Sequence, residues 1–98
     1  MIQKVFSVYD SKAEAFLPPF FCGTRGIAVR VFAQAANEAG HNFSKWPGDY
    51  TLFELGEFDD REGKFFVGGA AENLGTALQY VEGKEERLPL LESVDVDR

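Results

Sequence analysis

Hydrophobic and polar residues alternate over two stretches of the chain, and this alternation predicts β-strands. Residues 2–9 alternate with a period of two and are rich in β-branched and aromatic side chains, which favours a strand with both faces partly apolar. Residues 50–58 show the same period. In this second strand we expect Tyr50, Leu52 and Phe58 on one face and Phe53 with Leu55 on the other.

A β-hairpin is predicted where the second strand ends. The side chains of Asp59 and Asp60 can bond the backbone of a turn, and Gly63 can take the positive φ that a bulged loop requires. A short return strand over residues 64–67 then stops at Gly68.

The clearest helical periodicity lies in residues 25–39. Thr24 is the expected N-cap, and Gly40 is the expected glycine after the helix end. One apolar stripe is predicted, formed by Ile27, Val31, Ala35 and Ala39 together with Ala28, Phe32 and Ala36 beside them.

The segments between these elements are less regular. Residues 10–16 are predicted as a turn or a short helix. The prolines at 18 and 19 would end any helix there and hold Phe20 and Phe21 in an extended path. Residues 41–49 are predicted as a polar connector.

A second helix is predicted over residues 71–81, where Leu74, Leu78 and Val81 follow helical spacing. The predicted order is therefore β-α-β-β-α. It describes an α+β fold in which two helices cover one face of a small, antiparallel-dominated sheet.

The last part of the chain determines how this sheet would be completed. Residues 1–82 are expected to form a single α+β domain, and residues 83–98 an acidic tail that is extended or adds a late edge strand. A strand over residues 90–96 would make the fold ferredoxin-like, βαββαβ. Without it, one sheet edge stays open, and because a second subunit often caps such an edge, a homodimer is predicted.

Composition excludes several classes of function. The single Cys22 rules out an internal disulfide and a cysteine-only zinc site, and its apolar neighbours favour a small buried side chain. Nothing pairs it with His41, the only histidine, and there is no nucleophile, metal or cofactor motif. The acidic residues of the hairpin are interpreted as a solvated turn. We therefore expect a protein that is not an enzyme and needs no metal or cofactor.

Two further properties concern location. No apolar run approaches the roughly 20 residues of a membrane span, and the N-terminal residues do not resemble a secretion signal. The chain is expected to act in the cytoplasm, without a membrane partner.

Net charge is −6, but it is unevenly distributed. Residues 1–46 hold five cations against three anions, residues 47–81 hold two against seven, and residues 82–98 hold three against six. The mildly basic first half permits phosphate contacts on one face.

Aromatic and basic residues in the first half form the candidate binding site. Single-stranded nucleic acid is bound by stacking bases on aromatic rings while cations follow the phosphates. The predicted nucleic-acid-binding residues are Lys12, Phe20, Phe21, Arg25, Arg30, Lys45 and Trp46, with Tyr9 and Phe43 in the same composition pattern. Arg25 beside the free amides of a helix start could also hold an anion.

Several blocks, in this order and spacing, resemble the small nonstructural protein of gokushovirus-type microviruses, which are bacteriophages with circular single-stranded DNA genomes. The blocks are VYDSKA at 8–13, PFF at 19–21, AVRVF at 28–32 and PGDYTLFELGEFDD at 47–60, followed by Gly63. The resemblance covers residues 5–80 and does not extend to the tail.

The resemblance implies an accessory protein that acts in the cytoplasm of the infected bacterium and is absent from the virion. It also implies a role in DNA binding or in the switch from DNA replication to genome packaging. Two hypotheses follow. In the first, the chain binds single-stranded DNA. In the second, it is an acidic adaptor that binds the viral replication initiator or a procapsid component without touching DNA.

Overall fold

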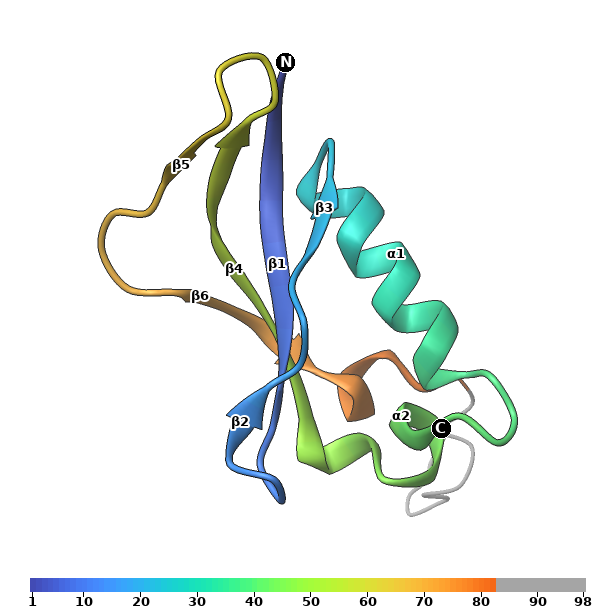
Figure 1. Ribbon diagram of the computed structural model, residues 1–98. Helices are drawn as coiled ribbons and strands as arrows, with labels where there is room; N and C mark the ends of the chain where they lie inside the picture. The colour runs from blue at the N-terminus through green and yellow to red at the C-terminus, as the bar shows by residue number, and fades with distance from the viewer. Residues whose placement is uncertain (83–98) are drawn as a thin grey trace.

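The computed structural model describes residues 1–82, which form one curved sheet with helices packed against it (Figure 1). The α+β fold class predicted from the sequence is confirmed. The predicted tail, residues 83–98, and its strand over 90–96 lie outside the described residues. The strands are β1 (Ile2–Asp10), β2 (Ala15–Phe16), β3 (Phe20–Cys22), β4 (Tyr50–Asp59), β5 (Lys64–Phe66) and β6 (Glu72–Thr76). The helices are α1 (Arg25–Ala36), α2 (Asn42–Lys45) and the short 3₁₀ helices η1 (Pro47–Asp49) and η2 (Ala77–Tyr80).

The long strands β1 and β4 form the centre of the sheet and pair along their whole length. The other side of β1 pairs with β2 and β3 in succession, and the other side of β4 pairs with β5 and β6. All of these pairings are antiparallel. The predicted first strand and the predicted hairpin, now β4 and β5, are confirmed.

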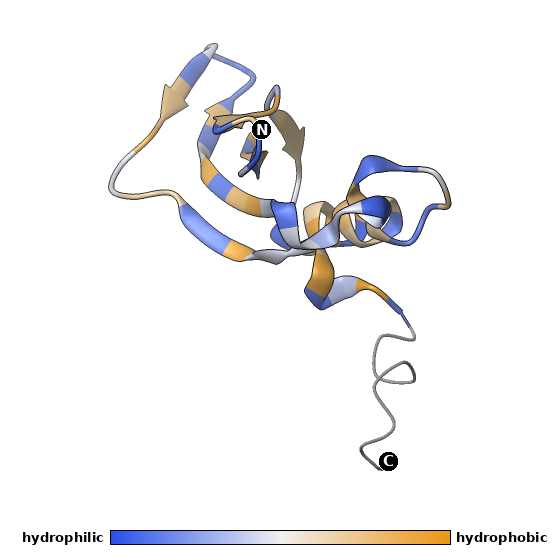
Figure 2. Cartoon of the chain, turned by 90° about the horizontal axis from the view of Figure 1, so that it is seen from below, coloured by the Kyte–Doolittle hydropathy of each residue, from blue (hydrophilic) through white to orange (hydrophobic). Residues whose placement is uncertain are grey.

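Helix α1 connects β3 to β4 across the sheet. Both strands run antiparallel to β1, so they are parallel to each other with β1 between them, which is a split βαβ arrangement. The connection places α1 on one side of the sheet, as the view from below shows (Figure 2). We call the sheet face against α1 the inner face and the opposite one the outer face.

One extra residue in β4 changes the side-chain alternation along the strand. Phe6 of β1 lies opposite Glu54, but its neighbour Val5 lies opposite Gly56, so Leu55 is the extra residue of a β-bulge. Side chains that follow the bulge therefore point to the opposite face from the one that simple alternation predicts.

The bulge explains one wrong prediction. Tyr50 and Leu52 are buried in the core on the inner face, as expected. Phe58, which was predicted to share their face, lies opposite Gln3 on the outer face, where its ring packs against Phe21.

Thr24 starts α1 as predicted, because its Oγ1 accepts a hydrogen bond from the backbone N–H of Ile27 at 3.2 Å. The buried side of the helix is formed by Ala28, Phe32 and Ala36, which follow one another at intervals of four. Ile27 and Val31, which belong to the same predicted stripe, are 43% and 47% exposed. The helix thus buries the part of the predicted stripe that contains Ala28, Phe32 and Ala36.

Helix α1 ends at Ala36, three residues before the predicted end, and Asn37 fixes this end. The side-chain amide of Asn37 donates to the carbonyl oxygens of Ala33 at 2.8 Å and Tyr80 at 2.9 Å. Its Oδ1 accepts from the N–H of Glu82 at 2.7 Å. These bonds connect the helix end to the chain that follows η2, so the helix stops where this tertiary contact forms.

One weaker prediction holds in one of its alternatives, and another is wrong. The segment over 10–16, predicted as a turn or a short helix, forms a turn that is followed by β2. The predicted helix over 71–81 is β6 followed by the single 3₁₀ turn η2. Gly75 has φ +111°, which no α-helix allows, and the Tyr80 hydroxyl donates to the Leu74 carbonyl at 2.7 Å to close the strand end onto η2.

The core is small. It consists of residues from the inner face of the sheet, from α1 and from η2, namely Phe6, Val8, Ala28, Phe32, Ala36, Tyr50, Leu52 and Ala77. Cys22 is half-buried and packs against this cluster. Only two of the ten phenylalanines, Phe6 and Phe32, are fully buried. Most of the other phenylalanine side chains therefore lie outside this core.

Gly56→Ala is expected to lower the free energy of unfolding by about 1–3 kcal/mol, the usual range for overpacking. A Cβ at this position would collide with the backbone carbonyl of Phe66 in β5, which would have to shift. Urea denaturation of the variant measures the loss.

The matched control is Gly48→Ala in η1, where a Cβ would meet open space. We expect this control to be unchanged or slightly more stable than the unmodified chain, because alanine restricts the unfolded chain more than glycine does. Equal stability of the two variants would show that β5 does not approach Gly56 as closely as the structure indicates.

Candidate functional site

Aromatic rings cover the outer face of the sheet in two clusters. The first, which we call the β2 cluster, consists of Tyr9, Phe16 and Phe53, with ring centroids 5.0 and 5.5 Å apart. The second, the β5 cluster, consists of Phe21, Phe58 and Phe65, with centroid distances of 5.4, 4.7 and 6.2 Å. Each cluster draws its three rings from three different strands.

Strand pairing brings these rings together. Tyr9 lies opposite Phe16 across β1 and β2, and Phe58 lies opposite Phe65 across β4 and β5. Phe21 lies opposite Val5 of β1 and so points to the same face as Val5. Because of the bulge in β4, Phe53 before it and Phe58 after it both face outward. Neither cluster would form from one strand alone.

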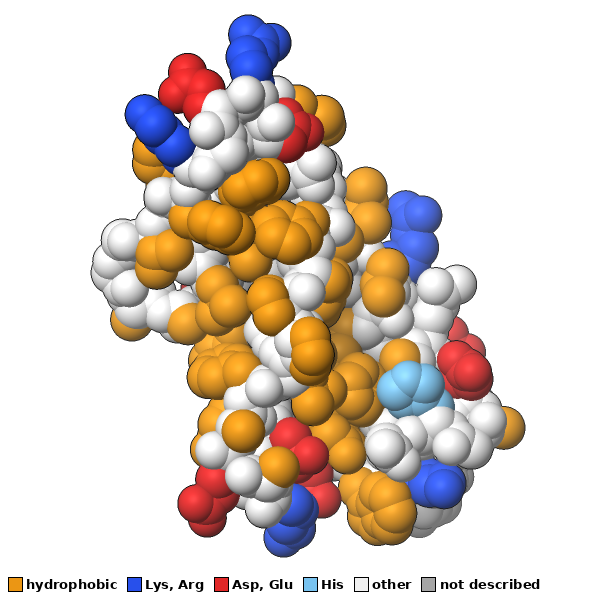
Figure 3. Space-filling model, in the orientation of Figure 1, with side chains coloured by type: hydrophobic (Ala, Val, Ile, Leu, Met, Phe, Trp, Pro, Cys, Tyr) orange, Lys and Arg blue, Asp and Glu red, His pale blue; other side chains and the backbone are white. Residues whose placement is uncertain are grey.

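The outer face is apolar and partly open to solvent. Phe16, Phe21 and Phe65 are 49%, 41% and 59% exposed. Between the clusters, Val5 and Ser7 are buried, and the Ser7 hydroxyl is satisfied because it donates to the Leu17 carbonyl. Figure 3 shows the hydrophobic side chains as a band over the strands. A surface of this kind on a small protein indicates a binding site more often than chance exposure.

Charged side chains lie around this band rather than within it. Figure 3 shows Lys, Arg, Asp and Glu side chains gathered at the upper and lower ends of the sheet. Lys12 lies in the turn between β1 and β2, while Arg61 and Lys64 belong to the β4–β5 hairpin, where Lys64 pairs with Glu62 at 3.4 Å. A ligand on the rings would therefore meet few cations.

The residues predicted from sequence as a binding site lie on several different surfaces. Phe21 belongs to the β5 cluster, whereas its neighbour Phe20 points inward, with its ring centroid 5.8 Å from that of Phe6. Lys45 and Trp46 lie at α2, with the Lys45 Nζ 5.7 Å from the centre of the Trp46 ring.

The two predicted arginines lie on or beside α1. Arg30 lines a shallow groove on the helix together with Gln34, Asn37 and Glu82. Arg25, at the start of the helix, is held by two carboxylates. Of the seven predicted residues, the structure thus places only Phe21 within an outer-face cluster.

Sequence reasoning missed most of the outer face. Phe16, Phe53, Phe58 and Phe65 were not among the predicted site residues. The sequence does show aromatic residues in several predicted strands. However, these rings can be assigned to one cluster only when the pairing of the strands is known.

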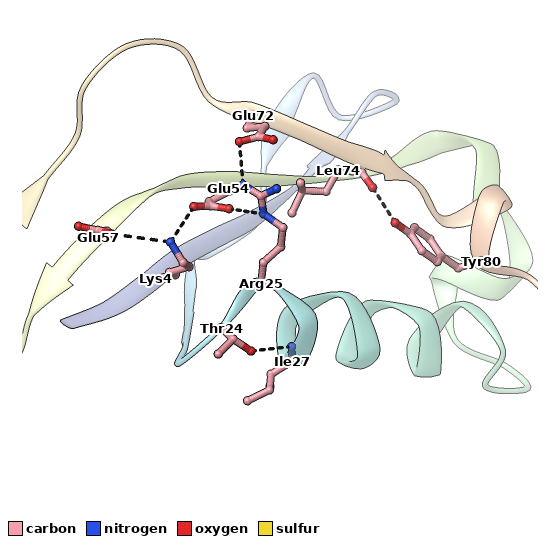
Figure 4. Close-up of polar contacts among 9 residues, drawn as sticks. All are labelled: Lys4, Thr24, Arg25, Ile27, Glu54, Glu57, Glu72, Leu74 and Tyr80. Carbon is pink, nitrogen blue, oxygen red and sulfur yellow. Dashed lines mark hydrogen bonds and ion pairs between the residues drawn. The ribbon is translucent and has the colours of Figure 1, made fainter. Parts of the chain in front are cut away.

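An ion-pair network fixes Arg25 on the inner side of the sheet (Figure 4). Its Nε donates to Glu54 Oε1 of β4 at 2.8 Å, and its Nη2 donates to Glu72 Oε1 of β6 at 2.8 Å. Lys4 of β1 approaches Glu54 Oε2 at 3.4 Å and Glu57 Oε2 at 3.7 Å. The network thus joins α1 to three strands of the sheet.

Glu54 is the central carboxylate of this network, and its side chain is only 14% exposed. Burial alone would raise the pKa of Glu54, and this is the largest single influence on it. The hydrogen bonds and positive charges of Arg25 and Lys4 together outweigh burial and lower that pKa below its ordinary value of 4.5.

The lone histidine and the lone cysteine have structural surroundings. His41 caps α2, because its Nδ1 accepts the backbone N–H of Phe43 at 3.0 Å. Burial raises the pKa of the Cys22 thiol in β3, which disfavours the reactive thiolate. Among residues 1–82, no three His, Cys, Asp or Glu side chains gather as metal ligands would, and no helix there is long and apolar enough to cross a membrane.

Comparison with known proteins gives a match to a protein family. A family model described as Phage ORF5 protein matches residues 3–80, from the second residue of β1 to the last residue of η2. Neither the curated proteins nor the solved structures contain a match to the chain.

Glu54→Gln is expected to reduce the free energy of unfolding near neutral pH by about 1–3 kcal/mol, the range for hydrogen bonds to charged groups. Because the folded pKa of Glu54 is lowered, its ionisation stabilises the fold above its ordinary pKa of 4.5. That contribution is lost as the pH falls through the folded pKa. The variant should therefore lose less stability on acidification than the unmodified chain. Urea denaturation at about pH 7 and about pH 3.5 measures both effects.

Glu57→Gln is the matched control. The Glu57 side chain is 48% exposed, and Lys4 is its one ion-pair partner among residues 1–82, so its loss should cost less than about 1 kcal/mol. Parallel acid profiles for Glu54→Gln and the unmodified chain would contradict the assigned role of Glu54.

Proposed function

Because the chain belongs to the family described as phage ORF5 proteins, we propose that it is a non-enzymatic phage accessory protein that binds single-stranded DNA on its outer face. In this proposal it acts in the cytoplasm of the infected bacterium, outside the virion. There it would regulate the change from DNA replication to packaging of single-stranded genomes.

The observation that supports this proposal is the pair of aromatic clusters on a sheet face that none of the described helices covers. Sheets that present aromatic rings to solvent bind single strands by stacking bases, as in RRM and OB folds. Each stacked base contributes roughly 1–3 kcal/mol. Phe16, Phe21 and Phe65 have the most exposed rings of the two clusters and are the candidates for stacking.

The charge of the molecule determines what kind of DNA this face could accept. A net charge of −6 and the few cations around the band give little attraction to phosphates. In a duplex the bases are stacked on one another, and their flat faces are not accessible to side chains. A face that relies on rings rather than cations therefore favours unpaired strands.

The runner-up function is an acidic adaptor that binds the viral replication initiator or a procapsid component. The same negative charge favours it, as does the lack of cations within the band among the residues that the structure describes. In that case the aromatic band would contact protein, and oligonucleotides would not compete for it.

Replacing one exposed ring in each cluster, Phe16→Ala and Phe21→Ala, is expected to weaken binding to a single-stranded oligonucleotide of about 15 nucleotides. Each loss should amount to roughly fivefold to a hundredfold, the equivalent of one stacked base. Fluorescence anisotropy of labelled oligonucleotide measures the affinity. Between about 50 and 200 mM salt the affinity should fall only slightly, because few phosphates are neutralised.

Val31→Ala is the control, since Val31 is 47% exposed but lies on α1. Trp46→Ala tests the predicted ring at α2 in the same assay. Unchanged affinity in both cluster variants would remove DNA from the outer face, and a loss confined to Trp46→Ala would move the site to α2. If the unmodified chain binds no oligonucleotide even at low salt, the adaptor function remains.

A further inference from the structure

The two edges of the sheet are protected unequally. On the edge formed by β2 and β3, the strands are two and three residues long, and Pro18 and Pro19 separate them. Proline has no N–H to offer an incoming strand, and short or proline-containing edges resist pairing with other chains. This edge is therefore closed to strand addition.

The opposite edge is formed by β5 and β6, which differ from each other in polarity. Glu72 at the start of β6 is bound to Arg25, and Asn73 bonds the backbone of Gly75, whose positive φ bends the strand. In β5 and the residue after it, by contrast, Phe65, Phe66 and Val67 are 59%, 50% and 70% exposed.

No other described element covers β5 on either face. Figures 1 and 2 both show β5 at the edge of the sheet that is remote from α1. Phe65 lies opposite Phe58 on the outer face, and Phe66 lies opposite Glu57 on the inner one. Within residues 1–82 the strand pairs with β4 alone, so the backbone groups on its other side point away from this part of the sheet.

We propose that β5 is the edge through which two copies of this chain pair antiparallel, extending the sheet across a two-fold axis. The proposal goes beyond the proposed function and does not depend on DNA. The partner is a second copy because the β5 edge is complementary to itself. An isologous contact also uses both open edges at once, so assembly stops at the dimer.

The sequence of β5 fits one register of this pairing. With the two-fold axis at Phe66, each Phe66 would lie against Phe66 of the second copy. Phe65 would lie opposite Val67 on the outer face, and Lys64 opposite Gly68. Apolar side chains then meet apolar ones, and no like charges are directly opposed.

The size of the contact sets the expected strength of the dimer. The exposed parts of the Phe65 and Phe66 rings amount to about 200 Å² per copy, taking about 200 Å² for a whole ring. Even with Val67 and the backbone, the interface lies at the small end of the known range, where complexes are weak and transient. We expect a dissociation constant on the order of micromolar.

Pairing at β5 would also enlarge the outer face. Phe65 belongs to the β5 cluster, and an axis perpendicular to the sheet keeps the outer faces of both copies on the same side. The two β5 clusters would become neighbours on one continuous surface.

The first test is analytical ultracentrifugation of the full chain without DNA, from about 1 to about 500 μM, a range that spans the expected constant. The unmodified chain should change from monomer to dimer over this range. The double variant Phe66→Lys, Val67→Lys should raise the dissociation constant at least tenfold. Its control, Ile27→Lys, Val31→Lys, replaces two exposed apolar residues on α1 and should leave the constant unchanged.

A second measurement tests the register and does not require the lysine variant to fold. In a Cys22→Ser background, Phe66→Cys places two thiols across the proposed axis, where Cα atoms of paired strands lie 4.5–5.5 Å apart and a disulfide can form. Diamide would oxidise the two thiols to one disulfide and be reduced itself. Ala15→Cys on the closed edge should not cross-link.

The proposal fails if the unmodified chain stays monomeric at all concentrations or if the α1 double variant dissociates the dimer equally. It also fails if Ala15→Cys cross-links as readily as Phe66→Cys. Because no DNA is present in either experiment, these failures would leave the proposed DNA binding untouched.

Discussion

A single extra residue in β4 determines which aromatic rings the sheet displays. Up to Glu54, alternate residues of β4 face α1, and after Leu55 the alternation is reversed against β1. Without the bulge, Phe58 would point to the inner face and Glu57 would point outward. The β5 cluster would then lack its middle ring, and a carboxylate would stand among the remaining aromatic side chains. The bulge thus separates a charged inner side from an apolar outer side at this end of the sheet.

The alanines on the buried side of α1 explain why so many rings remain outside the core. The helix presents Ala28, Phe32 and Ala36 to the sheet, and the two alanines let the helix lie close to the strands. A close helix leaves room for few large side chains between the layers, and of the phenylalanines only Phe6 and Phe32 are fully buried there. The surplus rings stabilise one another in pairs across the strands. They remain exposed on the outer face, where the described part of the chain places no helix.

Local signals in the sequence predicted the elements whose causes are local. Alternation gave the first strand and the hairpin, and the Thr24 hydroxyl gave the start of α1. The helix predicted over 71–81 was wrong because Leu74, Leu78 and Val81 fit helical spacing as well as they fit a bent strand. The free edge of β4, far away in the sequence, made the strand the better solution. The same limit applied to the site. Arg25 was predicted to contact phosphate, but the fold pairs it with Glu54 and Glu72, which are distant in the sequence.

The ion-pair network and the aromatic clusters lie on opposite faces of the same strands. The two faces of the sheet therefore differ in charge and in apolar area. Arg25 and Lys4 are engaged by carboxylates on the inner side, so these cations contribute to the fold and offer little charge to a phosphate. What remains for recognition on the outer side is stacking area with little charge. Under the proposed function, such a face would distinguish unpaired bases from paired ones, because the flat faces of bases are accessible only in an unpaired strand. In a phage family, that distinction matters wherever single-stranded and duplex DNA occur in one cell. A sheet continued through β5 would add to this surface without adding charge.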